Sequence, residues 1–137
     1  MKHIHVTCAI VEKDGKVLST QRSEAMSLPL KWEFPGGKIS DGELPEECLK
    51  RELHEELGIA VVIFRSLNPV THQYPTFLIT LYPFVCRIST GEIKLHEHKA
   101  FTWLSPEKLH VLDWADADIP VMNNYRNTLQ HCFKKAP

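Results

Sequence analysis

The chain has 137 residues, of which 43% are hydrophobic and 24% are charged, as is ordinary for one globular domain over residues 1–137. Its formal net charge of −1 supplies no basic field for binding a nucleic-acid polymer. No apolar run is long enough to span a membrane, and the N-terminal segment lacks a cleavage-site pattern. We therefore expect a cytoplasmic protein without nucleic-acid or membrane partners.

The cysteines are far apart in the sequence and include no C-x-x-C pair: Cys8, Cys48, Cys86 and Cys132. A zinc site is therefore not expected, and a chain of this length can bury a sufficient core without disulfides. The pattern predicts free, mostly buried thiols in a reducing compartment.

The first predicted element is a β-hairpin over residues 3–22, because two apolar-rich runs flank the turn pair Asp14 and Gly15. Residues 23–31 are predicted to form a loop. Residues 32–37 are expected to be extended and then irregular, since the proline in this segment moves its predecessor away from the helical region and a Gly-Gly pair follows.

The clearest helix is predicted over residues 44–58. Pro45 suits the first helical position, and Gly58 suits the position just beyond the end. Leucines recur every four residues and predict a stripe that faces the core: Leu49, Leu53 and Leu57.

Two strands are expected next, over residues 60–73 and 76–88, with a turn near Tyr74 and Pro75. Pro83 lies inside the second strand and suggests an edge position or a bulge, because proline cannot donate to a strand neighbour.

Three further elements complete the chain: a strand over 100–104, a helix over 105–112 and a C-terminal helix over 119–135. Strands and helices are mixed without regular alternation. That order favours an α+β fold in which helices cover a mixed sheet.

Three carboxylates stand on one face of the predicted 44–58 helix, because Glu52, Glu55 and Glu56 are spaced i, i+3 and i+4. Like charges at this spacing near a helix C-terminus are unfavourable, whereas a hard divalent cation such as Mg²⁺ or Mn²⁺ would make them favourable. The alternative is that the three are solvated surface acids offset by Lys50 or Arg51.

The surrounding residues follow a fixed pattern: Gly37, five residues, Glu43, seven residues, Arg51-Glu52-Leu53, one residue, Glu55-Glu56, one residue, Gly58-Ile59. This pattern matches the signature of the Nudix hydrolases at every defined position. The chain resembles the MutT-like nucleoside triphosphate pyrophosphohydrolases in particular, with CTP and oxidised dGTP as substrate types. The resemblance implies an α/β/α sandwich around a mixed sheet, with the signature forming a loop–helix–loop.

The resemblance also implies a metal site made by Glu52, Glu55, Glu56, the carbonyl of Gly37 and the later acid Glu97. Glu52 would be the general base, with Glu97 as the alternative. Arg51 would orient a glutamate and act in catalysis, and Glu43 would brace the loop at the helix entrance. His96 and His98 flank Glu97, but two loop histidines are a better explanation than a zinc site, since no third ligand is evident.

By the same resemblance, Arg22 and Lys38 contact phosphates, and Glu33 lies near the nucleotide and the metals. Four residues match positions that line the base pocket: Ile4, Val6, Phe34 and Ile79. Each could equally be plain core.

Three positions depart from relatives. Leu44 replaces a Thr or Ser helix cap, Phe77 falls where the oxidised-guanine enzyme has an arginine, and Asp118 falls where that enzyme has a base-reading asparagine. As an ionised acceptor, Asp118 would suit the amine of cytosine or guanine. It could instead cap the helix that begins near Ile119.

The expected reaction is Mg²⁺- or Mn²⁺-dependent hydrolysis of a nucleoside triphosphate to the monophosphate and pyrophosphate. The alternatives are a Nudix hydrolase of another nucleoside diphosphate-linked substrate and a non-catalytic nucleotide-binding module. The protein is expected to be a monomer or a weak homodimer.

Overall fold

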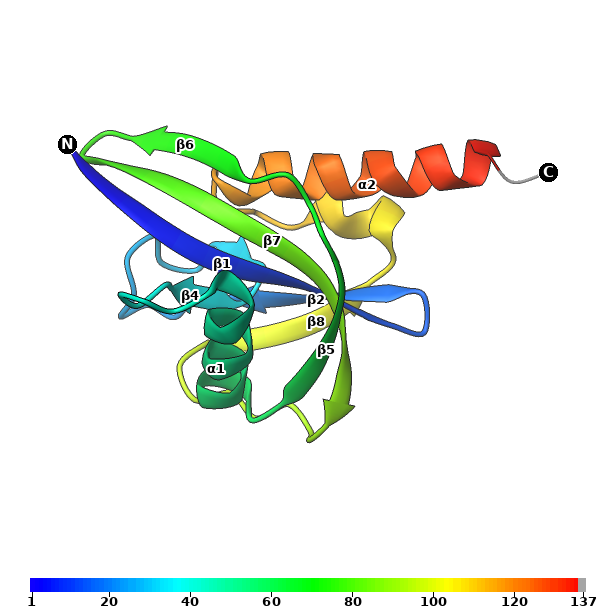
Figure 1. Ribbon diagram of the computed structural model, residues 1–137, viewed down its shortest axis with the longest axis horizontal. Coiled ribbons are helices and arrows are strands. Elements are labelled where there is room, and N and C mark those ends of the chain that lie inside the picture. The colour runs from blue at the N-terminus through cyan, green and yellow to red at the C-terminus, as the bar shows by residue number, and fades with distance from the viewer. Residues whose placement is uncertain (136–137) are drawn as a thin grey trace.

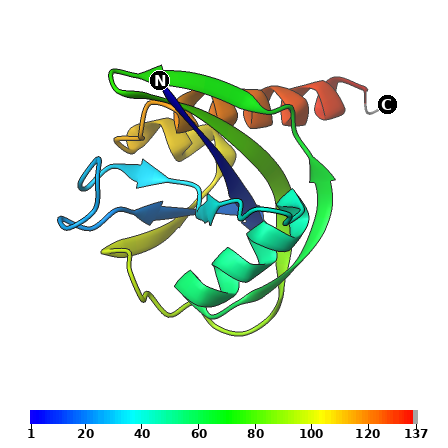
Figure 2. The same cartoon turned by 60° about the vertical axis from the view of Figure 1, so that its left-hand side comes forward.

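The computed structural model describes residues 1–135, and side chains up to residue 129. The described strands are β1 Lys2–Lys13, β2 Lys16–Gln21, β3 Trp32–Glu33, β4 Gly36–Lys38, β5 Ala60–Ser66, β6 Val70–Tyr74, β7 Phe77–Thr90 and β8 Ala100–Leu104. The helices are α1 Pro45–Leu57, the 3₁₀ helix η1 Pro106–Val111 and α2 Asp118–Lys135. Figures 1 and 2 show α1 and α2 on opposite sides of the strands, so the predicted α/β/α sandwich is confirmed.

Strand β1 organises the mixed sheet (Figure 1). It pairs in parallel with β7 from Lys2 to Val11, and antiparallel with β2 at its C-terminal end and with β4 in its middle. Gly36 is needed for the β4 contact, because a Cβ there would overlap the carbonyl of Thr7. This close approach places the loop before α1 against the middle of the sheet.

The predicted hairpin and signature helix are confirmed. Asp14 and Gly15 connect β1 to β2 with φ of 52° and 74°, as a tight two-residue turn requires. Helix α1 starts at Pro45, and Gly58 follows it with φ of 70°. Leu44 provides no side-chain cap, but its N–H donates to the Glu47 carboxylate 3.2 Å away.

The predicted strand over 60–73 is wrong, because this segment forms two strands, β5 and β6, that both pair antiparallel with β7. The break lies opposite Pro83. This residue has no N–H to donate, and its carbonyl accepts the N–H of Leu67 at 3.0 Å. Pro83 is therefore in a central strand, at the change of partner, and neither the edge position nor the bulge was the correct explanation. The predicted 105–112 helix is the shorter 3₁₀ helix η1.

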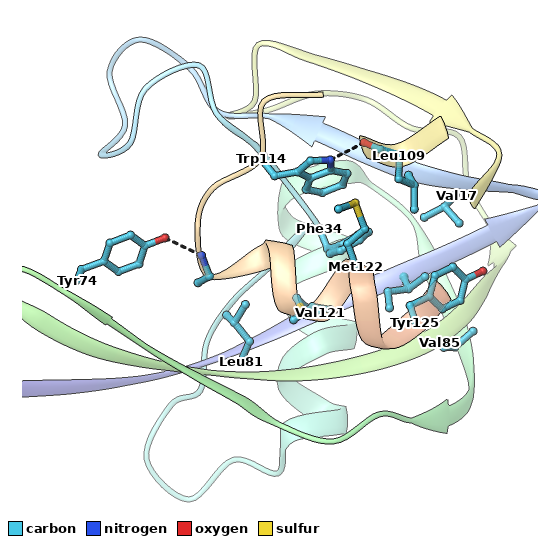
Figure 3. Packing of buried hydrophobic residues seen from close by; sticks show 13 residues of the cluster. Val17, Phe34, Tyr74, Leu81, Val85, Leu109, Trp114, Val121, Met122 and Tyr125 are labelled. Carbon is cyan, nitrogen blue, oxygen red and sulfur yellow. Dashed lines mark hydrogen bonds between the residues drawn. The ribbon is translucent and has the colours of Figure 1, made fainter. Parts of the chain in front are cut away.

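Two buried clusters hold the layers together. The leucine stripe of α1 is fully buried against β1, β5 and β7, as its spacing predicted. Val121, Met122 and Tyr125 of α2 pack on the other face with residues of β1, β2 and β7 (Figure 3). The sheet is thus covered on both sides, and the site is built where β1, β4 and α1 meet.

None of the helices described within residues 1–135 combines the length and apolarity of a transmembrane span. Cys8, Cys48 and Cys86 are buried free thiols, as predicted, while the Cys132 side chain lies outside the described residues.

Candidate active site

One cavity of about 380 Å³ gathers the residues predicted to bind substrate. Its wall includes Ile4, Val6, Arg22, Glu33, Phe34, Lys38, Ile79 and Asp118. Gly37 and Glu56 of the predicted metal set line the same cavity. A polar, acidic end therefore adjoins an apolar pocket, as a ligand with a charged tail and a flat base requires.

A larger hollow of about 1120 Å³ lies elsewhere, between the β1–β2 turn, β8 and α2. Its wall mixes Lys16, Arg87, Trp103 and Tyr125 with several acids, and it contains none of the predicted site residues. The size of a cavity therefore does not identify the candidate site. The smaller cavity is the candidate because it contains the residues predicted to bind substrate.

Arg51 is the centre of an ion-pair cluster on α1. Its guanidinium binds both oxygens of Glu43, with Nε–Oε2 at 2.7 Å and Nη2–Oε1 at 3.0 Å. Its Nη1 also reaches Glu52 at 2.9 Å and Glu55 at 3.2 Å. The Arg51 guanidinium and the Ser40 N–H lower the pKa of Glu43 to about 2. Glu43 therefore braces the loop before the helix, as expected, and Arg51 orients Glu52.

The three helix carboxylates differ in environment more than their spacing suggested. Glu55 is exposed and turned toward Arg51, whereas Glu56 is buried. The Glu56 Oε2 atom has no hydrogen-bond partner. Burial, followed by the charges of Glu52, Glu33 and Glu97, raises the pKa of Glu56 to about 9. A buried, unpaired carboxylate among other acids is unfavourable unless a cation or a proton compensates it.

The expected convergence of the three carboxylates on one point is not seen: within the described residues, no three His, Cys, Asp or Glu side chains are grouped closely enough to hold a metal. The reason is that Arg51 pulls Glu52 and Glu55 toward its guanidinium. The donor set still fits a hard divalent cation. Gly37 leaves space that a Cβ would close against the Glu52 carboxylate, and the orphaned Glu56 oxygen lines the same cavity as Gly37.

Glu97 lies beside the end of α1. The N–H groups of Lys94 and His96 donate to the carbonyls of Leu57 and Glu56, at 2.9 and 3.2 Å, and tie the loop before β8 to the helix. Glu97 itself is exposed and does not line the cavity, but its charge contributes to the raised pKa of Glu56. The loop thus brings the charge of Glu97 close to Glu56 from outside the helix.

His98 contacts Glu33, a partner that its interpretation as a loop histidine did not predict. Its buried ring places Nε2 2.9 Å from Oε2 of Glu33, and Arg22 Nη1 donates to the other oxygen of Glu33 at 2.7 Å. Arg22 also donates to the carbonyl of Ser27. Glu33 is therefore held on both sides inside the cavity. His96 is exposed, so the two histidines do not form a pair.

Asp118 marks the apolar end of the cavity. Its Oδ2 accepts the N–H of Phe34 at 2.9 Å, a bond to the β3–β4 linker rather than to its own helix. The capping interpretation is therefore not supported. Burial first, and then the charge of Glu33, raise the pKa of Asp118 well above its usual range. Burial therefore disfavours the charged form of Asp118, and its expected role as a hydrogen-bond acceptor for the base stays a prediction.

Aromatic rings lie at the apolar end of the cavity, near Asp118. Phe34 lies 4.6 Å from the ring of Trp114, whose Nε1 donates to the carbonyl of Leu109 (Figure 3). Phe77 and Tyr74 pack with their rings 5.0 Å apart on the cavity wall. These rings provide an apolar surface suited to a flat base.

Comparison with known proteins agrees with this geometry. Residues 1–125 match the model of the NUDIX domain. The chain is 36% identical to the CTP pyrophosphohydrolase of Escherichia coli K12 over 91% of this chain and 93% of the relative. It is 31% identical to the 8-oxo-dGTP diphosphatase of Haemophilus influenzae over 92% and 93% of the two chains. The solution structure of the Escherichia coli ORF135 protein superposes with a TM-score of 0.81 at 33% identity, covering 100% of this chain and 96% of that one. The chain therefore belongs to the Nudix family.

Proposed function

We propose that this protein is a divalent-metal-dependent nucleoside triphosphate pyrophosphohydrolase with CTP as its preferred substrate and oxidised dGTP as the second candidate. The observation that carries the proposal is the single cavity that joins a base-sized apolar pocket to the buried Glu56 and to Gly37. Its volume of about 380 Å³ is that of a small-ligand site.

The residues proposed to hold Mg²⁺ or Mn²⁺ are Glu52, Glu55, Glu56, Glu97 and the carbonyl of Gly37. When bound, the cation would neutralise phosphate charge and align the triphosphate for in-line attack by water. The support from this chain is the chemistry of the donors, which are hard oxygens, and the orphaned Glu56 oxygen, which needs a positive partner.

Other residues are proposed to bind the phosphates, to accept the proton of the attacking water and to position these groups. Arg22 and Lys38 line the cavity and are proposed to bind phosphate oxygens. Glu52, held by Arg51, is proposed to take the proton from the attacking water, with Glu97 as the alternative base. Glu33 is fixed between Arg22 and His98 and keeps the Arg22 side chain in place. The products are the nucleoside monophosphate and pyrophosphate.

The choice of base rests on the apolar end of the cavity. Ile4, Val6, Phe34 and Ile79 provide contact area, and Asp118 provides the polar group. The Asp118 oxygen that Phe34 does not contact can accept a hydrogen bond from an amine of the base. Cytosine offers its exocyclic amine, and oxidised guanine offers its own amine and a ring N–H. The names of the two relatives support the same two bases.

The proposal is tested by a panel of triphosphates, dinucleotides and nucleotide sugars with Mg²⁺. Turnover of CTP to CMP and pyrophosphate supports it, while binding without turnover indicates a non-catalytic module. A cytoplasmic location and a monomer or weak homodimer are part of the proposal, and the buried free thiols are in keeping with a reducing compartment.

Asp118→Asn is expected to change the ranking of CTP, dCTP, UTP and oxidised dGTP. An amide cannot lose or gain a proton and presents a fixed donor and acceptor, so kcat/KM for the best substrate should change by about fivefold to a hundredfold relative to UTP, or roughly 1–3 kcal/mol. Steady-state kinetics on the four substrates measure it. An unchanged ranking with lower thermal stability would show that Asp118 only ties α2 to Phe34.

A further inference from the structure

Tyr74, the last residue of β6, lies on the wall of the substrate cavity. It is 7% exposed, and its ring packs against the ring of Phe77, at 5.0 Å, and edge-on against that of His72, at 4.6 Å. Figure 3 shows the ring pointing toward the start of α2. The sequence assigned this residue only to a turn, but its side chain is fixed in the site.

The hydroxyl group of Tyr74 has an unused donor. Its oxygen accepts the backbone N–H of Ala117 at 3.1 Å. A phenol offers one donor and two acceptor positions, so this bond occupies an acceptor position and leaves the O–H proton available. Among the residues with described side chains, none is found to accept that proton. A buried donor without a partner is costly, so a ligand that brings an acceptor is favoured.

Asp118 supplies the second polar group of this part of the cavity. Asp118 follows Ala117 directly, lines the same cavity and is anchored through its Oδ2 to Phe34. The wall around the two polar groups is apolar, with Ile4 and Leu81 among its residues. In such pockets, a few placed polar groups set the orientation of the ligand.

We propose that Tyr74 is a specificity-determining residue, whose O–H donates to the ring acceptor beside the amine that Asp118 binds on the substrate base. The inference rests on the proposed function and names how that site selects its base. On cytosine the acceptor is the ring nitrogen N3. On uracil N3 carries a hydrogen, so the Tyr74 donor faces another donor, and the contact is lost.

The first test replaces only the hydroxyl group. Tyr74→Phe is expected to lower kcat/KM for CTP by about tenfold, the usual effect of one hydrogen bond, with little change for UTP. Ribose 5-triphosphate, which has no base, should be turned over as before. The matched control is Tyr125→Phe, because the Tyr125 hydroxyl donates to Glu12 and lies outside the cavity. The control should change none of the three rates.

The second test removes the acceptor from the substrate. Wild-type enzyme should prefer CTP over its 3-deaza analogue, in which N3 is a C–H group, by about tenfold, and Tyr74→Phe should not distinguish the two. This comparison needs only the wild type if the variant fails to fold. An equal fall on the baseless triphosphate, or wild-type indifference to the 3-deaza analogue, would overturn the inference. If the wild type turned over no triphosphate at all, the proposed function itself would be refuted.

Discussion

Glu52→Gln is expected to lower kcat by about 10²- to 10⁴-fold, the usual contribution of a general base, while the protein stays folded. Glu52 is held by Arg51 at 2.9 Å and faces the space that Gly37 leaves open. An amide of the same shape keeps the packing but cannot take a proton from water. Steady-state kinetics with Mg²⁺ and circular dichroism measure the two effects.

The matched control for this prediction is Glu46→Gln. Glu46 lies on the same helix, in its exposed first turn, and does not line the cavity. It should retain nearly full activity. Glu97→Gln separates the two candidate bases: if that variant loses more activity than Glu52→Gln, the base is Glu97 and Glu52 acts only as a ligand. Near-normal kcat in both variants would rule out both assignments.

Glu56→Gln is expected to stabilise the metal-free protein at pH 8 by on the order of 2 kcal/mol, or about 5 °C in melting temperature, while removing most activity. The physical reason is that Glu56 is buried, one oxygen is unpaired, and neighbouring acids repel its charge. Glutamine keeps the shape and is neutral without the proton that Glu56 must take up on folding at this pH.

The raised pKa of Glu56 determines the direction in which the stability of the fold changes with pH. The pKa of Glu56 is about 9 in the fold against 4.5 in the unfolded chain, so between these values the folded state holds a proton that the unfolded state lacks. Stability therefore falls as pH rises from about 4.5 to about 9. Thermal melts in chelator should show this slope in the wild type and a flatter one in Glu56→Gln. Glu55→Gln is the control, because Glu55 is exposed and should leave the slope unchanged. A steep slope that persists in Glu56→Gln would assign it to another group.

Local sequence predicted the parts of the site that depend on local spacing. Pro45, Gly58 and the leucine stripe define α1 and orient it, and Asp14 with Gly15 defines the hairpin. These features depend on residues within one or two turns of each other. The position of each side chain around α1 and a contact between Arg51 and a glutamate were predicted, but the carboxylates do not converge on one point because Arg51 competes for them.

Contacts between distant segments could not be predicted from the sequence. Asp118 bonds to Phe34 across 84 positions, and His98 bonds to Glu33 across 65. Strand periodicity indicates which residues share a face but not which strands become neighbours. For the same reason, the break between β5 and β6 could not be placed, although Pro83 marked the position in β7 where it occurs. The raised pKa of Asp118 follows from burial, which only the fold determines.

The central claim is that the acids of α1 support metal-dependent cleavage of a nucleoside triphosphate between its α- and β-phosphates. Phosphorus NMR of CTP incubated with the protein tests it most directly. With Mg²⁺, the spectrum should show CMP and pyrophosphate in equal amounts, and with excess chelator it should show unchanged CTP. Full turnover in chelator, or the release of CDP and phosphate, would contradict the account.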